Sequence, residues 1–401
     1  MCGSHSHTLR VANRRDRFRE YMSRLDAAAD PRLALKRGFY VSRHDRGNAD
    51  QISGRLELRP ASTHLVVGGV GAGKTTQLLV ARERLDSLGD THAIYIDISR
   101  HQDLRKLQPG VLLTLAGLEA CALLTPGSDV RRRTEGRFKN WAHGSANYPK
   151  LYPDPKYWSE GVVTPPAQDF EENIALMREA LEEVRVALTD SVPHLVLLID
   201  SLDRLPRLEP FTGVLEQDVA AIASLGIGLV LVGPIQAIHG LQRLIADRFD
   251  YVYHQSFIDV QRDQAGRDFL LQVLRQRSPE QLLPQPSCQQ LVSFSGGVLR
   301  DLINLARQAV EEAYLDGSDT VASNHVVTAA DAYGRSLMIG LRQNEIEVLQ
   351  RVRTLGSFVL SSEEDLALLA TRRVLEYREA ELRYVVHPTL EPLLKQLAGE
   401  A

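Results

Sequence analysis

The chain has 401 residues, and its 47 basic and 51 acidic side chains leave a formal net charge of −4. This length predicts two or three domains and a large buried core. The near balance of charge excludes a strongly basic nucleic-acid coat and a long acidic disordered chain, although it does not exclude a local basic patch.

The cysteines and the apolar runs indicate which cellular compartment the protein occupies. Cys2, Cys121 and Cys288 lie far apart and share no metal-ligand spacing, which disfavours a disulfide framework and fits a reducing environment. No apolar run approaches the ~20 residues that span a bilayer, and the N-terminus lacks the apolar core of a secretory signal. We therefore expect a cytoplasmic protein with no membrane partner.

Residues 1–60 are polar and rich in arginine, and we expect them to form a helical lead. One helical pattern runs from Tyr21 to Leu35 with an interruption before Pro31. A second helical pattern runs from Asn48 to Leu58.

Residues 61–255 alternate between strand and helix patterns. Apolar runs without polar interruption indicate strands that are buried on both faces. Such runs lie at 64–69 and 92–99, and within 193–205 and 225–234. Helical spacing of apolar residues follows the first run and recurs over 168–188. The alternation predicts a core of α/β class, in which helices cover both faces of a parallel sheet.

Residues 123–166 interrupt this alternation with the least readable pattern of the chain. Between 131 and 160 there are seven basic and three acidic residues. We expect a long irregular insertion here, and such insertions are usually functional or mobile. The aromatic residues of the segment are Trp141, Tyr148, Tyr152, Tyr157 and Trp158.

Strand patterns stop near residue 256. Successive helical patterns predict a helical lid over 256–336. Residues 337–401 follow the order helix, helix, hairpin, helix, which predicts a winged helix-turn-helix.

The motif G-x-x-x-x-G-K-[ST] lies between the first predicted strand and the helix after it, which is the context that a phosphate loop requires. Its glycines let backbone N–H groups wrap a phosphate, and the helix N-terminus favours the anion. We expect Lys74 to reach the β- and γ-phosphates of ATP, and Thr75 to bind Mg²⁺ through its hydroxyl. The predicted nucleotide-binding residues are Gly68, Gly69, Val70, Gly71, Ala72, Gly73, Lys74, Thr75 and Thr76.

Asp200 ends a buried apolar run downstream of this loop. By itself, an Asp at a strand end is more often a turn or cap residue. Beside a phosphate loop, however, a carboxylate at the tip of a buried strand is placed to bind the metal. We therefore predict that Asp200 and Thr75 share the Mg²⁺ ion.

Four segments together resemble ATPases of the AAA+/STAND assemblage, in particular the origin-recognition-type, NACHT and KAP ATPases. The resemblance covers about residues 35–390 in the same order, and it implies a P-loop NTPase core with a helical lid and a winged helix. The segments are the loop GGVGAGKTT, the strand LLIDSLDRL, the segment ADRFDYVYHQSF and the helix SGGVLRDLI.

The acidic strand end departs from the usual AAA+ pattern. AAA+ enzymes usually place a catalytic Glu directly after the metal-binding Asp, where this chain has Ser201. NACHT-like proteins carry a small residue there and a further acid three positions after the Asp, which matches Asp203. The resemblance suggests that Asp203 orients the attacking water, and the alternative is a structural partner of Arg204. The departure favours a slow switch over fast hydrolysis.

The resemblance suggests roles for further residues. Arg300 resembles a sensor-2 arginine that contacts the γ-phosphate. Arg248 lies where oligomerising AAA+ proteins carry an arginine finger, with Arg243 as a rival. Gln236 is a weak substitute for a sensor-1 residue. His387 resembles a phosphate-sensing histidine of STAND winged helices, although a local hydrogen bond at the hairpin end is the slightly favoured alternative.

Two functions stay open at this point. The first is an ATP-driven conformational switch that works with a protein partner or effector, can self-associate on ATP binding, and serves in anti-phage defence or signalling. The second is a DNA-binding ATPase that resembles origin-recognition or transposition regulators. Residues 341–401 hold eight basic and ten acidic residues, which disfavours DNA there. The basic segment 131–156 is the better DNA candidate. A small-molecule P-loop kinase is disfavoured by the C-terminal domains.

Overall fold

The computed structural model describes residues 13–26, 31–43, 47–142, 170–205, 207–360, 362–378 and 381–399. The chain divides into two compact units. The core unit comprises residues 44–256, and the lid unit comprises residues 1–43 together with 257–401.

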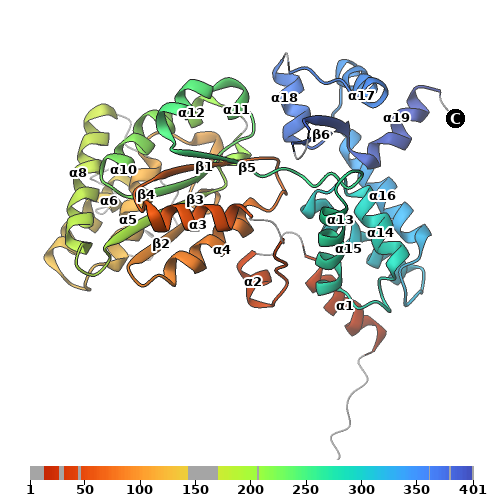
Figure 1. Cartoon of the computed structure of the whole chain (residues 1–401), viewed down its shortest axis with the longest axis horizontal. Coiled ribbons are helices and arrows are strands. Elements are labelled where there is room, and N and C mark those ends of the chain that lie inside the picture. The colour runs from red at the N-terminus through yellow and green to blue at the C-terminus, as the bar shows by residue number, and fades with distance from the viewer. Residues whose placement is uncertain are drawn as a thin grey trace, which may run out of the picture. The chain divides into compact units, whose positions relative to one another are not determined.

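The core unit is built on a parallel sheet of five strands in the order β2-β3-β4-β1-β5 (Figure 1). Because all five strands run in the same direction, their carboxyl ends lie along one edge of the sheet. The strands are β1 (Thr63–Val67), β2 (Thr91–Asp97), β3 (His194–Asp200), β4 (Gly228–Val232) and β5 (Tyr251–His254). The predicted parallel α/β core is confirmed, and β5 is an edge strand that the sequence patterns missed.

Helices cover both faces of this sheet (Figure 1). On one face α4 packs against β2, β3 and α3. On the other face α5 and α8 share a buried apolar cluster with alternate residues of β3, namely Leu195, Leu197 and Ile199. The core helices are α3 (Asn48–Leu58), α4 (Lys74–Asp86), α5 (Val111–Leu123), α6 (Asp129–Ala142), α8 (Phe170–Leu188), α9 (Glu209–Val214), α10 (Ala220–Ser224), α11 (Ala237–Gly240) and α12 (Gln242–Arg248), and short helical turns lie at Ile98–Arg100, Leu104–Lys106, Leu202–Arg204 and Leu215–Val219.

The expected irregular insertion is wrong over 129–142, where the chain forms α6. This helix packs against α5 and α8. Phe138 is fully buried, and a Cβ on Gly117 of α5 would lie 2.2 Å from its ring, so the absence of a side chain at Gly117 lets the two helices meet. The apolar spacing Val130, Phe138, Trp141 was the available helical signal. Residues 143–166 lie outside the described part of the chain.

The lid unit contains a helical bundle around one buried apolar cluster. Helix α1 contributes Phe18 and Leu25 to this cluster. The predicted helix from Tyr21 is wrong at its start. The Asn13 side chain accepts a hydrogen bond from the Asp16 N–H and caps α1, which begins at Arg14, about two turns before Tyr21. The helices are α1 (Arg14–Arg24), α2 (Pro31–Lys36), α13 (Gln264–Arg277), α14 (Gln285–Phe294), α15 (Leu299–Leu315) and α16 (Ser323–Met338).

The end of the chain forms the predicted winged helix (Figure 1, blue). Strands β6 and β7 form an antiparallel hairpin in which Val374 faces Val386. Buried residues of the hairpin and of the helices make a small core of their own, which includes Leu349, Leu368 and Leu390. The elements are α17 (Gln343–Leu355), α18 (Glu363–Ala370), β6 (Val374–Tyr377), β7 (Arg383–Val386), a short turn (Pro388–Leu390) and α19 (Glu391–Leu397).

Two further observations concern the described part of the chain. No helix in it combines the length and the apolar character that crossing a membrane requires. Cys121 and Cys288 are buried free thiols, as expected for a chain without a disulfide framework.

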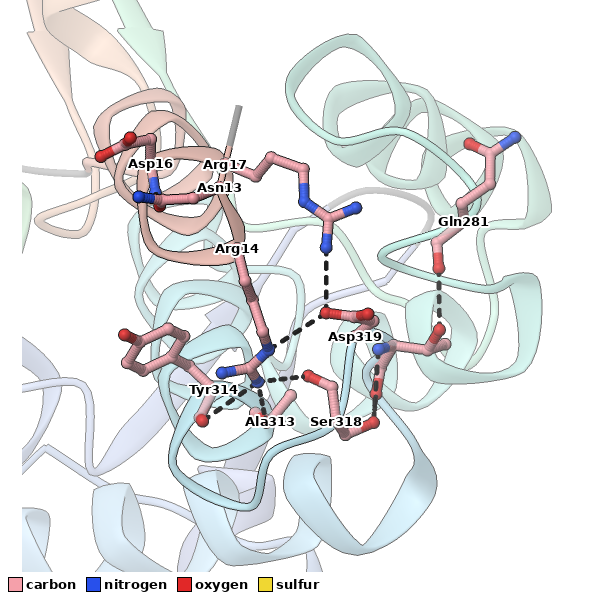
Figure 2. Close-up of polar contacts among 10 residues, drawn as sticks. Asn13, Arg14, Asp16, Arg17, Gln281, Ala313, Tyr314, Ser318 and Asp319 are labelled. Atoms are coloured by element: carbon pink, nitrogen blue, oxygen red, sulfur yellow. Dashed lines mark hydrogen bonds and ion pairs between the residues drawn. The ribbon is translucent and has the colours of Figure 1, made fainter. Parts of the chain in front are cut away.

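The first residue of α1, Arg14, holds this helix on the lid bundle by contacting the C-terminal end of α15. Figure 2 shows the Arg14 guanidinium donating to the carbonyl oxygens of Ala313, Tyr314 and Ser318, at 3.3, 3.1 and 2.8 Å, and pairing with Asp319 at 3.1 Å. The Ala313 and Tyr314 carbonyls also accept backbone hydrogen bonds from Ser318 and Gly317, so Arg14 adds a charged donor there and offsets the negative end of the helix dipole.

We predict that Arg14→Ala lowers the free energy of unfolding by about 1–2 kcal/mol, because three carbonyl groups lose a charged donor. Urea unfolding of the full chain measures this change. Arg15→Ala is the matched control, since the Arg15 side chain is 61% exposed and has only a distant ion pair. Equal destabilisation by the two variants would contradict the assigned role.

His64 on β1 is a buried aromatic residue at the edge between β1 and β5. Its ring stacks on Tyr253 and lies 5.0 Å from the ring of Tyr251. Its two nitrogens bond the hydroxyls of Ser62 and Tyr253, at 2.7 and 2.9 Å. Burial lowers the pKa of His64 from 6.5 to about 4, so the folded protein holds this ring neutral.

We predict that stability falls as the pH drops from 6.5 to 4. The unfolded chain takes up a proton on His64 in this range, whereas the folded chain resists it until about pH 4, so the loss is about 3 kcal/mol. Urea unfolding at pH 7 and pH 4 should show a smaller loss for His64→Gln than for the wild type. His194→Gln, at a half-exposed position, should behave as the wild type does.

Candidate nucleotide site

The phosphate loop joins β1 to α4 at the carboxyl edge of the sheet, as the motif predicts. Gly71 and Gly73 have φ values of 94° and 96°, in the region that favours glycine. Gly68 is needed for another reason, because a Cβ there would lie 2.3 Å from the carbonyl oxygen of Gln255. The loop conformation thus depends on the two glycines that the motif requires, Gly68 and Gly73, and also on Gly71, which the motif leaves open.

Lys74 is the first residue of α4 and is only 3% exposed. Its Nζ donates to the carbonyl oxygens of Gly68 and Gly69, at 2.7 and 2.8 Å, and pairs with an Asp203 carboxylate oxygen at 2.8 Å. A buried ammonium is therefore held inside the loop, where a phosphate would find a fixed positive charge. The loop glycines and this cation together form a cradle that suits a nucleotide phosphate.

Asp200 ends β3 and is 2% exposed. It accepts hydrogen bonds from the Tyr95 hydroxyl at 2.8 Å, from the Ser201 N–H at 2.7 Å and from the Thr75 hydroxyl. Burial raises the pKa of Asp200, and the neighbouring Asp203 charge raises it further. A divalent cation beside Asp200 would offset both effects, so the carboxylate and the Thr75 hydroxyl suit the oxygen preference of Mg²⁺.

No group of three or more His, Cys, Asp or Glu side chains able to hold a metal occurs in the part of the chain that the structure describes. A Mg²⁺ ion that is bound with a nucleotide takes one or two protein ligands and completes its shell with phosphate oxygens and water.

Asp203 lies in the short turn after β3, and its ion pair with Lys74 is the contact that neither predicted role included. The side chain of Asp203 is 11% exposed. A phosphate that took over the Lys74 ammonium would compete with this carboxylate. The ion pair with Lys74 holds Asp203 at the phosphate loop, so a pairing with Arg204 is not required to position it.

Asp97 is a site residue that sequence reasoning missed. It ends β2 directly opposite Asp200 in the sheet register. Burial alone would raise its pKa, but hydrogen bonds from Ser201 and Ser99 outweigh this and hold the pKa of Asp97 below its ordinary value. The available signal was its place at the end of the strand IYID, since carboxyl ends of parallel strands share an edge.

The other predicted residues of the core unit lie after β4. Arg248 is the last residue of α12, is half-buried, and accepts a hydrogen bond from the Thr63 hydroxyl on its carbonyl oxygen. Arg243 is exposed on the same helix, and Gln236 is half-buried just before α11. An arginine finger acts on the nucleotide of a neighbouring subunit, so the role of Arg248 remains a proposal.

Two predicted residues belong to the lid unit. Arg300 is half-buried in the first turn of α15, and its sensor role remains a proposal. His387 is fully buried, with its Nδ1 2.8 Å from the Thr389 hydroxyl, its ring against Tyr333 and its Nε2 3.5 Å from Asp301. These contacts favour the local hydrogen-bonded role of His387 over phosphate sensing.

Carboxylates partly offset the basic residues of α6, since five cations share three carboxylates. Each cation has a carboxylate partner on α6 itself or on α8, and Trp141 packs against Phe138. The remaining basic and aromatic residues of the segment, from Tyr148 to Trp158, lie outside the described residues. The ion pairs are Arg131–Glu135, Arg132–Asp129, Arg133–Glu183, Arg137–Glu183 and Lys139–Glu135.

No protein-family model matches the chain, and no curated protein sequence matches it. Solved structures with a similar chain path include Drosophila ORC bound to DNA, with 13% identity, a TM-score of 0.45, and coverage of 100% of this chain and 96% of that one. Cdc6p from Pyrobaculum aerophilum has 14% identity and a TM-score of 0.43, over 94% and 98% of the two chains. The Thermotoga maritima RuvB Holliday junction branch migration motor has 14% identity and a TM-score of 0.41, over 88% and 94%.

These identities and TM-scores are low, and the fold is recognised from its own topology. The strand order β2-β3-β4-β1-β5, with the phosphate loop after β1, is typical of AAA+ P-loop ATPases. The helical bundle and the winged helix follow the core in the order that the sequence predicts.

Proposed function

We propose that this chain is an ATP-binding, slowly hydrolysing ATPase that works as a conformational switch. The observation that carries this proposal is the buried Lys74 ammonium inside the phosphate loop, beside the Thr75 and Asp200 pair. A fixed cation and a pair of oxygen ligands at one sheet edge suit a nucleotide phosphate and its metal ion.

Each residue of the site has a proposed task. The backbone N–H groups of 68–73 and the Lys74 ammonium would hold the phosphates, and Thr75 and Asp200 would hold Mg²⁺. The bound metal would neutralise charge on the phosphates. Arg300 would report the γ-phosphate to the lid unit, and Arg248 would act across an interface if the chain self-associates.

Slow turnover is supported by the acidic strand end. Ser201 occupies the position after Asp200, so a carboxylate is absent where fast AAA+ enzymes carry one. Asp203, the proposed water-orienting group, is paired with Lys74 at 2.8 Å. Hydrolysis would therefore require the phosphates to bind Lys74 first, because only then would the Asp203 carboxylate be released to orient the water.

The division of the chain supports a switch between two bodies. The lid bundle and the winged helix belong to one compact unit. Buried Asp301 of α15 pairs with Arg372 at 2.9 Å, and Arg372 also donates to the Tyr333 hydroxyl. A Cβ on Gly334 of α16 would lie 2.2 Å from the carbonyl oxygen of Thr389. Contacts this close favour a winged helix that moves with the lid.

A protein partner suits the winged helix better than DNA. Helix α18 begins with exposed Glu363 and Glu364, and phosphate would be repelled there. The ion pairs of α6 also weaken the support for a DNA surface in 131–142, because each cation there already has a carboxylate partner. We propose an effector protein as the partner, in anti-phage defence or signalling, within a reducing compartment such as the cytoplasm.

A nucleotide titration combined with mass measurement tests this function. We predict that the wild type binds ATP with Mg²⁺, and that a non-hydrolysable analogue changes its hydrodynamic size or its assembly. Lys74→Ala should lose this binding, since it removes the buried cation of the loop. Arg82→Ala, at a half-exposed position on the same helix, is the control that should bind normally. Normal ATP affinity of Lys74→Ala would overturn the site.

Asp203→Asn separates binding from turnover. We predict an ATP affinity equal to or above that of the wild type, because the competing partner of Lys74 loses its charge. Turnover at saturating ATP should fall by about tenfold or more, because the attacking water loses its carboxylate. Unchanged turnover, measured as released phosphate, would leave Asp203 a structural partner of Lys74.

A further inference from the structure

Ser201 has an unusual backbone for its position. It is one of two non-glycine residues with positive φ among the described residues, at 78°, and it is 2% exposed. This conformation costs free energy in a residue with a side chain, and the surrounding structure must hold it. Gly would adopt it without strain, yet the chain carries a residue with a hydroxyl.

The strained backbone coincides with a specific contact of the Ser201 hydroxyl. This hydroxyl donates a hydrogen bond to the carboxylate of Asp97, which ends the neighbouring strand β2. Asp97 lies opposite Asp200 in the sheet register, and Ser201 directly follows Asp200, the proposed metal-binding acid. Hydrogen bonds from Ser201 and Ser99 hold the pKa of Asp97 below its ordinary value despite its burial, and Arg100 lies 3.3 Å from its carboxylate.

We propose that Asp97 is a positioning residue for ATP hydrolysis and acts through the Ser201 hydroxyl. Because the hydroxyl proton is committed to Asp97, the lone pairs of the Ser201 oxygen are free to accept from the attacking water. An in-line water must direct its own lone pair at the γ-phosphorus and therefore needs acceptors for its hydrogens. Asp203 can accept one hydrogen once phosphate takes Lys74, and Ser201 accepts the other.

This inference rests on the proposed ATPase function and adds a water-holding pair to it. The water oxygen bonds to the γ-phosphorus, the bond from that phosphorus to the β–γ bridging oxygen breaks, and the surplus proton leaves with the phosphate product. Neither Ser201 nor Asp97 changes its protonation state in the step. The pair replaces the carboxylate that is missing after Asp200 with a neutral acceptor whose orientation an adjacent strand sets.

Ser201→Gly tests the pair, because stability and turnover should change in opposite directions. The variant relieves the strain at φ 78°, so its thermal midpoint should rise. Turnover should fall by about 10- to 100-fold, with ATP affinity within about twofold of the wild type. Ser201→Ala should lose the same turnover without the gain in stability. A structural role alone would instead give Ser201→Gly wild-type turnover, and this result would overturn the inference.

Asp97→Ala should lose turnover to the same degree as Ser201→Gly, and the double variant should lose no more than either single variant. Additive losses would overturn the inference. Asp97→Asn keeps an acceptor for the Ser201 hydroxyl and should restore part of the turnover. Ser99→Ala removes a different partner of Asp97 and should hydrolyse ATP at the wild-type rate.

The same assays separate the two proposals. A wild type without turnover would overturn the ATPase function itself. Wild-type turnover that survives Ser201→Gly would overturn only the role of the pair.

Discussion

The buried ammonium of Lys74 is the interaction on which the rest of the site depends. Two loop carbonyls and the Asp203 carboxylate surround it, and the side chain is 3% exposed. Burying a charge is costly unless it is paired and hydrogen-bonded, so these three acceptors are a condition for the loop to fold as it does. In the proposed function, the same charge would be the fixed cation for a phosphate, and a bound phosphate would release Asp203 from it. Nucleotide binding and the freeing of the Asp203 carboxylate would then be linked through the Lys74 Nζ atom.

The parallel sheet supplies the second constraint, because it brings the carboxyl ends of separate strands to one edge. Asp97 and Asp200 face each other across β2 and β3 although more than a hundred residues separate them in the chain. The strained turn at Ser201 follows directly and directs its hydroxyl to Asp97. In the lid unit, a comparable cross-element contact joins Asp301 to Arg372 and ties the winged helix to the bundle.

Sequence patterns were most reliable where the spacing of residues within a few positions specifies the structure. The phosphate loop, the α/β alternation and the order helix, helix, hairpin, helix were all confirmed, because glycine spacing and apolar period act within a few residues. The patterns failed at α6, where charged residues hid an apolar face, and at β5, an edge strand of four residues. They also left the charge of 131–142 unexplained, since its neutralisation by Glu183 comes from a helix more than forty residues away.

The sequence by itself determined that an α/β core with a phosphate-loop motif after its first strand is followed by a helical bundle and a winged helix, because short-range spacing marks each of these. It also determined that Ser201 stands where a carboxylate is usual. Only the tertiary structure decided that Asp203 pairs with Lys74, that Asp97 reaches Ser201, and that His387 is buried against Asp301 and Tyr333. These contacts depend on strand register and helix packing, which bring distant residues together and leave no mark in local sequence.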